Sequence, residues 1–396
     1  MIELISNKLL LQNYSILFPN YIIIGDNMEK RLDVIDLFLK ILSVESVTPN
    51  DGGLLTYIEN YLANFEATWI NEGGVKNLFL TKKFKEGKHL CFAGHVDVVP
   101  AGDGWESNPF VPMIKDGYIY ARGTQDMKSG VAAFVQAVRD MDDDFSGRLS
   151  LLLTSDEEGD GTYGTQIVLK HLKEIDLLPD YCIIAEPTCE KEMGDAIKIG
   201  RRGSINGYLT LKGKQGHAAY PEKAINPIHN IAPILAEIAG HNLDNGDENF
   251  APSKLVITDI RSGIEVTNVT PNELKMMFNV RNSTNTTQES LRAFMEEKLN
   301  GLEYELELQQ GSYPFVTNKS SFIVQELSQA IEEETGVKTK LSTAGGTSDG
   351  RHIAPYGIEV VEFGVINDRI HGLNERTSIK EVETLYNISV NMIKRF

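Results

Sequence analysis

The sequence predicts an α/β protein with a mixed, mostly parallel sheet and a smaller inserted α+β domain. Short apolar runs typical of strands alternate with longer runs typical of helices, which is the order that covers a parallel sheet with helices. The main predicted strands span residues 89–93, 149–154, 181–185 and 359–363, and the main predicted helices span 127–140, 165–174 and 322–335. Apolar residues between Leu32 and Leu42 indicate one further amphipathic helix.

The order of elements changes in the middle of the chain. Strand, helix, strand, strand, helix and strand are predicted at 205–212, 227–239, 254–259, 273–280, 288–299 and 303–308. This β-α-β-β-α-β order is ferredoxin-like. A chain of 396 residues also exceeds the size of one hydrophobic core. We therefore expect an N-terminal extension (1–27), a main domain (28–203 and 314–396) and an inserted domain (204–313).

Composition narrows the class of protein. The chain has 38 basic and 56 acidic residues and a formal charge of −18, which argues against nucleic acid or an anionic membrane as a partner. It contains no apolar run long enough to span a membrane. Cys91, Cys182 and Cys189 lack metal-binding spacing, so we expect reduced thiols in a cytoplasmic protein. The first 27 residues carry Glu3 and lack a cleavage site, so Met28 is an alternative start.

Acidic and imidazole side chains follow several predicted strands. His95 and Asp97, Asp126, the run Asp156-Glu157-Glu158, Glu186 and His371 come from five separate loops. An open α/β sheet places its ligands at the carboxyl ends of its strands. Imidazoles and carboxylates suit Zn²⁺, and two histidines with three acids can fill two metal sites.

The neighbouring acids Glu157 and Glu158 can divide two tasks. One can bind metal while the other moves a proton, because a carboxylate committed to a metal is a poor proton shuttle. Taken singly, each residue has a simpler interpretation. Asp126 would be the N-cap of the helix that follows it, and Glu157 and Glu158 a solvated acidic turn. The ordered set favours the metal site.

The motifs resemble the M20 family of metallopeptidases. The matching segments are 94–100, 122–130, 154–159, 200–204, 215–221, 345–351 and the stretch around His371, whose tail keeps the family's Asn-Glu as Asn374-Glu375. The first three mark the family as a whole. The Gly-Arg-Arg-Gly-Ser segment at 200–204 and the Gly-Gly-Thr-Ser-Asp-Gly-Arg segment at 345–351 resemble the members that hydrolyse N-succinyl-diaminopimelate.

This resemblance implies a zinc aminopeptidase-like catalytic domain and an inserted lid and dimerisation domain. It also implies two Zn²⁺ per subunit, with Co²⁺ as an alternative in one site, and a cis peptide between Asp126 and Met127. The implied ligands of the first ion are His95, Asp126 and Glu186, and those of the second are Asp126, Glu158 and His371. Glu157 would be the general base. Asp97 would orient the imidazole of His95.

The implied substrate is a small amino-acid derivative with three carboxylates. An acidic protein needs local arginines to bind so anionic a ligand, because guanidinium groups pair with carboxylates in a bidentate manner. The candidates are Arg201, Arg202, Arg281 and Arg351, each of which could also be a surface ion pair. Gly346 and Thr347 lie in a glycine-rich turn that could hold a carboxylate. The resemblance places His217, Tyr220 and Asn268 on the lid, with His217 reaching the site of the other subunit of a homodimer.

Two alternatives stay open. Another M20 deacylase, such as an acetylornithine deacetylase or a dipeptidase, would share the metal centre, and the 200–204 segment argues against it. A non-catalytic binding protein could keep the fold without the metals. The complete ligand set and the retained Glu157 argue against that alternative.

Overall fold

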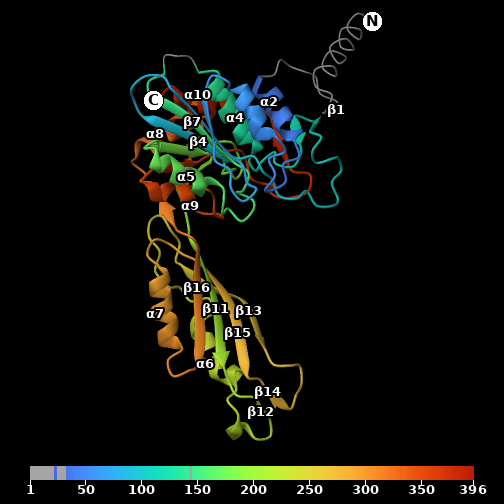
Figure 1. Cartoon of the computed structure of the whole chain (residues 1–396), viewed down its shortest axis with the longest axis vertical. Helices are drawn as coiled ribbons and strands as arrows, with labels where there is room; N and C mark the ends of the chain where they lie inside the picture. The colour runs from blue at the N-terminus through green and yellow to red at the C-terminus, as the bar shows by residue number, and fades with distance from the viewer. Residues whose placement is uncertain (1–21, 25–32, 142–144) are drawn as a thin grey trace, which may run out of the picture. The chain divides into compact units, whose positions relative to one another are not determined.

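An eight-stranded sheet forms the centre of the main part of the protein (Figure 1). The computed structural model describes residues 22–24, 33–141 and 145–396. The strand order is β18 (Lys340–Ser342), β9 (Ala196–Lys198), β19 (Glu359–Glu362), β8 (Tyr181–Ile184), β4 (His89–His95), β7 (Arg148–Thr154), β3 (Asn77–Lys83) and β2 (Glu66–Trp69). The four central strands, β19, β8, β4 and β7, are parallel to their neighbours within this group. The predicted fold class is therefore confirmed.

Two groups of helices accompany this sheet. One contains α2 (Asp33–Leu42), α4 (Lys128–Arg139), α8 (Phe322–Thr335) and α10 (Ile379–Ile393), and the other contains α5 (Thr165–Glu174) and α9 (Gly350–Ile353). Figure 1 shows β4 and β7 between α4 and α10 on one side and α5 and α9 on the other. Helix α3 (Leu54–Tyr61) also belongs to this part of the protein, and a small sheet joins β1 (Ile22–Ile24), β5 (Met113–Lys115), β6 (Tyr118–Tyr120) and β20 (Arg376–Ser378). Strand β4 is buried along its whole length, as expected of a central parallel strand.

The sheet register brings the loops of interest to one edge. His95 ends β4 and lies opposite Thr154, the last residue of β7, while Ala93 lies opposite Ile184, the last residue of β8. The loops that follow these three strands therefore start at the same edge. Helix α4 packs tightly there, because a Cβ at Gly130 would lie 2.0 Å from the Cβ of Ala185. Only glycine permits this approach.

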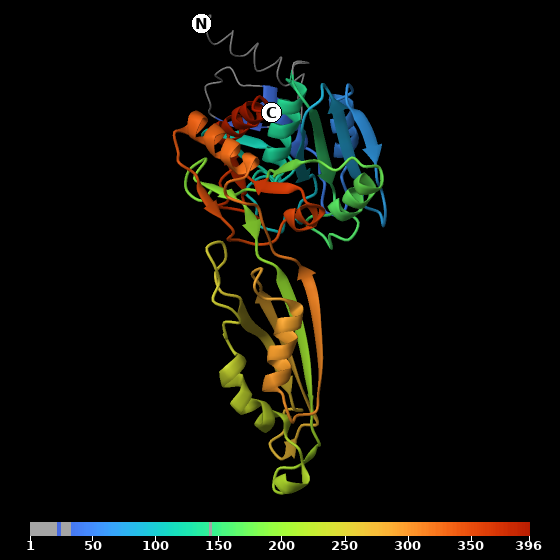
Figure 2. The ribbon, with the colours of Figure 1, turned by 90° about the vertical axis from the view of Figure 1, so that its left-hand side faces the viewer.

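A second compact unit comprises Gly200–Val316 and Thr343–Thr347. Its sheet has the order β13 (Lys254–Ser262), β15 (Glu273–Arg281), β11 (Ser204–Lys212) and β16 (Tyr304–Ser312). Helices α6 (Pro227–Ile238) and α7 (Gln288–Lys298) lie on one face of this sheet (Figure 2). Burial alternates along β11 and β15, and their inward residues form an apolar core with the two helices. A capping box at Thr287 and Ser290 starts α7.

The unit boundaries differ from the predicted ones. The second unit begins at Gly200 and ends at Val316 because β10 (Gly200–Arg201) pairs with β17 (Phe315–Val316). It also includes Thr343–Thr347, which the sequence assigned to the main domain. The hydroxyl of Thr343 donates a hydrogen bond to the carbonyl of Asn249, and this contact ties the segment to the second unit.

Two further expectations concern composition and the start of the chain. The three cysteines are buried free thiols, as predicted. Within the described ranges, no helix has the length and apolarity needed to cross a bilayer. Residues 1–21 and 25–27 of the predicted extension lie outside the described residues, whereas β1 pairs in parallel with β5.

Candidate metal centre

Asp126 lies between two histidines that come from distant parts of the chain. Its Oδ1 is 3.1 Å from Nε2 of His95, and its Oδ2 is 3.4 Å from Nε2 of His371. The same Nε2 of His371 is 2.9 Å from Oε1 of Glu158. Each oxygen of Asp126 thus faces a different imidazole, which is the arrangement of a bridging carboxylate. Helix α4 starts after Asp126 with Met127 as its N-cap, so the N-cap interpretation of Asp126 does not hold.

The backbone fixes the tautomer of His95. Its Nδ1 is 2.8 Å from the backbone carbonyl oxygen of Asp97, whereas the nearest carboxylate oxygen of Asp97 is 3.7 Å away. A carbonyl only accepts hydrogen bonds, so Nδ1 carries a hydrogen, and Nε2 is the ring nitrogen that faces Asp126. The Asp97 carboxylate accepts the N–H of Glu158 at 3.2 Å. It therefore contacts the loop of Glu158 more closely than the imidazole that it was expected to orient.

Glu157 and Glu158 belong to two overlapping groups of possible ligands. His95, Asp126 and Glu158 bring ligand atoms within 4.8 Å of one another, and so do His95, Glu157 and Glu186. The geometry therefore places Glu157 close enough to bind a metal as well as to act as a base. The peptide between Asp126 and Met127 is cis, as the family resemblance implies.

The charges of the site perturb its titrating groups strongly. Burial, together with the negative charges of Asp349 and Asp126, raises the pKa of Glu157 to about 8. Burial and the same Asp126 charge raise the pKa of Glu186 well above its usual value. Hydrogen bonds from the His371 imidazole to the carboxylates of Asp126 and Glu158 raise the pKa of His371 to about 10. These shifts all report an excess of carboxylate charge in a confined space.

The donor set fits divalent metal ions. Carboxylate oxygens and imidazole nitrogens converge from five segments of the chain, and this mixture suits Zn²⁺ and similar ions. A cation would relieve the repulsion among carboxylates that raises the pKa of Glu157 and Glu186. Nε2 of His95 already faces the bridging position of Asp126. The residues present therefore match a metal site.

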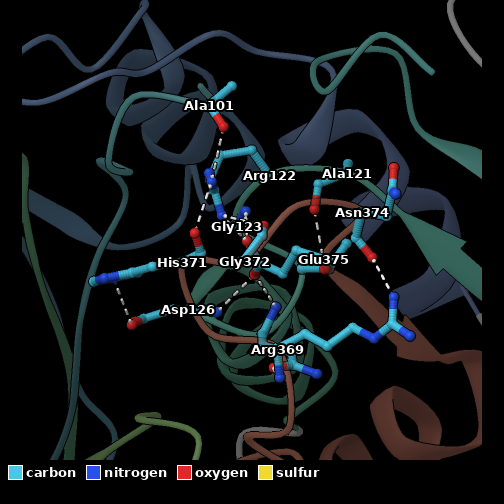
Figure 3. A network of polar contacts seen from close by, with 12 residues as sticks. Ala101, Ala121, Arg122, Gly123, Asp126, Arg369, His371, Gly372, Asn374 and Glu375 are labelled. Atoms are coloured by element: carbon cyan, nitrogen blue, oxygen red, sulfur yellow. Dashed lines mark hydrogen bonds and ion pairs between the residues drawn. The ribbon is translucent and has the colours of Figure 1, made fainter. Parts of the chain in front are cut away.

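A buried polar network supports the two loops that carry Asp126 and His371 (Figure 3). Figure 3 shows Arg122 and Glu375 between these loops, with contacts to both sides. Gln125 adds two further links, because its amide donates to the carbonyl of Arg376 and accepts the N–H of Arg369.

Most of the predicted substrate residues belong to the second unit, and several of them gather in two groups. In the first, Nη1 of buried Arg201 is 3.4 Å from the carbonyl of Ala344, and a Cβ at Gly345 would lie 2.4 Å from the same nitrogen. Gly345 also has φ +116°, a backbone conformation that favours glycine. Both the close approach of Arg201 and this φ value therefore explain the glycine here. Gly346 is exposed and Thr347 half-buried in this segment.

Arg202 and Arg281 flank a backbone pair that ties their two segments together. The N–H of Gly203 donates to the carbonyl of Asn282 at 2.8 Å, and the N–H of Asn282 donates to the carbonyl of Gly203 at 3.2 Å. The fourth arginine candidate, Arg351, belongs to the main unit and donates from Nε to Nε2 of His352 at 3.0 Å.

The second group surrounds a two-stranded antiparallel sheet, β12 (Gly216–His217) with β14 (Val269–Thr270). His217 lies against the ring of Tyr220 with centroids 5.8 Å apart, and Asn268 accepts the N–H of Ala218 at 2.9 Å. His217, Tyr220 and Asn268 are exposed.

Four buried residues received no role from the sequence, although all lie inside the quoted motifs: Arg122, Lys128, Asp349 and Glu375. Asp349 accepts a hydrogen bond from the hydroxyl of Thr165 at 2.7 Å. Lys128 donates to the carbonyl of Val44 at 2.8 Å, and burial lowers its pKa to about 7. The motifs marked these residues, but a motif does not show which loops a side chain connects.

Comparison with known proteins identifies the class. A model of peptidase family M20/M25/M40 matches residues 91–395, and the chain belongs to this family. The chain is 66% identical over 365 residues to a succinyl-diaminopimelate desuccinylase of Sulfurovum sp. (strain NBC37-1), covering 92% of this chain and 99% of that relative. A desuccinylase of Sulfurimonas denitrificans is 63% identical over 362 residues, covering 91% and 99%.

Solved structures share the fold. Aminopeptidase PepT from Bacillus cereus matches with a TM-score of 0.76 and 22% identity over 91% of this chain and 97% of that one. A Bacillus subtilis protein described as a dinuclear metal-binding peptidase of the M20 family matches with a TM-score of 0.67 and 14% identity, covering 91% and 96%.

Proposed function

We propose that this chain is a dizinc amidohydrolase that cleaves N-succinyl-LL-2,6-diaminopimelate into succinate and LL-diaminopimelate, a step toward lysine and peptidoglycan precursors. The observation that carries the proposal is the placement of Asp126 between His95 and His371, with Glu157 and Glu158 beside them. The desuccinylase name of relatives at 66% and 63% identity supports the substrate. The three free cysteines are consistent with a cytoplasmic enzyme.

We assign one zinc ion to His95, Asp126 and Glu186 and the other to Asp126, Glu158 and His371, with cobalt as an alternative in one site. The two oxygens of Asp126 support this division, since each faces a different histidine. Bound there, the ions would supply Lewis acidity that polarises the amide carbonyl and lowers the pKa of water.

Glu157 is the proposed general base. It takes a proton from the attacking water and returns it to the leaving amine. Its pKa of about 8 in the protein's own field would fall when cations bind nearby, toward the near-neutral range that suits a base. Asp97 helps to place the proposed ligands, because its backbone carbonyl holds His95 and its carboxylate holds the N–H of Glu158.

His217 is the proposed donor to the amide oxygen, supplied by the partner subunit of a homodimer that forms through the inserted domain. Its Nδ1 accepts the N–H of Ala219 at 3.0 Å, so the neutral ring carries its hydrogen on Nε2. An N–H at that position can stabilise the negative charge that grows on the carbonyl oxygen. The exposure of His217 supports this role.

Arginines and backbone groups of the second unit are the proposed carboxylate ligands of the substrate. The packing of Arg201 on the 343–347 segment supports a common binding region with Gly346 and Thr347. The further proposed members are Arg202, Arg281, Tyr220 and Asn268.

One assay tests the substrate. Zinc-loaded protein is given N-succinyl-diaminopimelate, N-acetylornithine or simple dipeptides at matched concentrations, and released amine is measured. We expect the succinyl substrate to have the highest kcat/KM. A higher value for N-acetylornithine or for a dipeptide would assign the protein to another M20 activity, and metal binding without any hydrolysis would favour a binding protein.

A further inference from the structure

Glu375 is a fully buried acid whose carboxylate meets only hydrogen-bond donors. Its Oε1 accepts the backbone N–H groups of Gln125 at 2.7 Å and Asp126 at 3.3 Å. Its Oε2 accepts the N–H of Gly123 at 3.0 Å and Nη1 of Arg122 at 2.7 Å. A protonated carboxyl would need an acceptor for its own hydrogen, so these contacts indicate an ionised Glu375. The acid thus holds the turn that ends in Asp126.

Arg122 completes the connection in the opposite direction. Arg122 is only 2% exposed, and Cζ of its guanidinium group lies 5.2 Å from the centre of the Trp105 ring. Nη2 donates to the carbonyl of His371 at 3.3 Å and to that of Ala101 at 3.2 Å, and Nη1 reaches the carbonyl of Gly372 at 3.3 Å. Arg122, at the start of the turn that ends in Asp126, therefore holds the backbone of the His371 loop. In return, Glu375 from the His371 loop holds the backbone of that turn.

This reciprocal arrangement matters because the His371 loop is not part of the central sheet. His95 and Glu186 follow β4 and β8, whose positions are fixed by the hydrogen bonds of a parallel ladder. His371 instead lies in a loop where it and Asn374 adopt positive φ values of 59° and 54°. This conformation is uncommon for residues other than glycine, so a loop that contains two such residues depends on surrounding contacts to hold it. Arg122 and Glu375 supply such contacts.

We propose that Arg122 and Glu375 form a clamp that sets the position of His371 relative to Asp126, and so the affinity of the metal site that contains His371. This inference rests on the proposed metal centre. Neither residue is a proposed ligand or touches reacting atoms, so both are positioning residues. The clamp predicts a larger effect on the site of His371, since both loops of that site depend on it, whereas the other site shares only Asp126 and takes His95 and Glu186 from loops anchored to the sheet. Partners that orient a metal ligand typically change metal affinity by about 10–100-fold.

Glu375→Gln is the primary test. The amide keeps the side chain's size but turns an NH₂ donor toward groups that are themselves donors. Zinc affinities of wild type and variant are measured by competition with a chromophoric chelator. We expect the ion of the His371 site to bind about 10–100-fold more weakly and the other ion to lose clearly less affinity.

A second variant covers the risk that Glu375→Gln leaves Arg122 buried without a partner, which is often strongly destabilising. The pair Arg122→Met with Glu375→Gln removes both charges together, and we expect the same selective loss. Asp244→Asn is the matched control. Asp244 is a carboxylate of the second unit that accepts bonds from Ser253, Ser283 and Thr286. Its replacement should lower thermal stability while both zinc affinities stay unchanged.

A combined variant separates positioning from general support of the fold. If the clamp acts mainly through His371, adding Glu375→Gln to His371→Ala should cost much less zinc affinity than the same change costs the His371 site of the wild type, because one of the two residues that it positions is already absent. With a merely structural Glu375, the two losses would be equal.

Three outcomes would overturn the inference. Equal loss of both ions in Glu375→Gln would show general damage, and unchanged affinities would show that the clamp is dispensable. Wild-type protein that binds no metal would overturn the metal centre and the clamp together, which distinguishes that failure from the other two.

Discussion

The most informative perturbation is Glu157→Gln, because the structure allows two roles for this residue. Glu157 lies within ligand distance of His95 and Glu186, but the proposed metal sites use Glu158 and leave Glu157 as the base. The change keeps the shape of the side chain and removes its ability to accept the proton of water. A pKa of about 8 in the protein's own field shows that this carboxyl group takes up protons readily.

The expected loss can be estimated. General base catalysis contributes about 10²–10⁴-fold, which corresponds to about 3–5.5 kcal/mol of barrier at 1.36 kcal/mol per tenfold. We expect kcat to fall by that factor while both metal ions stay bound. The neighbouring variant Glu158→Gln is the matched control, since a lost ligand should remove metal as well as activity.

The assay combines initial rates on N-succinyl-diaminopimelate with elemental analysis of the same samples. Glu157→Gln protein that keeps both metals and most of its activity would refute the base assignment. Protein that loses a metal together with its activity would show that Glu157 is a ligand, as the group of His95, Glu157 and Glu186 permits.

Three further predictions concern stability, pH and assembly. Gly130→Ala should lower the free energy of unfolding by about 1–3 kcal/mol, because the added methyl group would overpack against the loop after β8. Gly311→Ala is the control and should have a smaller effect, because its Cβ would lie 3.5 Å from its nearest neighbour. Equal melting temperatures of the two variants would contradict this prediction. In chelator-treated protein, the raised pKa values of Glu157 (about 8) and His371 (about 10) mean that the folded state binds more protons than the unfolded one. Stability should therefore fall as pH rises from about 5 to 9, and a higher melting temperature at pH 8.5 than at pH 6 would exclude this account. For assembly, mixing inactive His217→Ala and Glu157→Ala subunits should restore hydrolysis, and a mixture that stays inactive after proven subunit exchange would rule out a histidine acting across the dimer.

The sequence was informative where local patterns carry the structure. The strands that became β4, β7, β8 and β19 are short apolar runs between polar residues, and their predicted spans agree with the observed ones to within two residues at each end. Helices α5 and α8 match their predicted ranges, because apolar periodicity marks such elements locally; α8 is in addition followed by Gly336. The acids and histidines after these strands were visible for the same reason.

The ranges of the two units were less predictable. The 343–347 segment joins the second unit through Thr343 and through the approach of Gly345 to Arg201, and the sequence gives no sign of contacts between such distant residues. The contact of His95 with the backbone of Asp97, rather than with its carboxylate, also depends on a local geometry that residue spacing does not specify.

The sequence by itself thus determined the fold class, the family and the identities of the proposed ligands, because these depend on periodicity and on motifs that stay intact along the chain. Only the tertiary structure decided that Asp126 divides its two oxygens between His95 and His371, and that Arg122 and Glu375 connect the two loops. The physical reason is distance along the chain. Hydrogen bonds and ion pairs act over a few ångströms, so contacts between residues far apart in sequence exist only once the sheet has brought their loops to one edge.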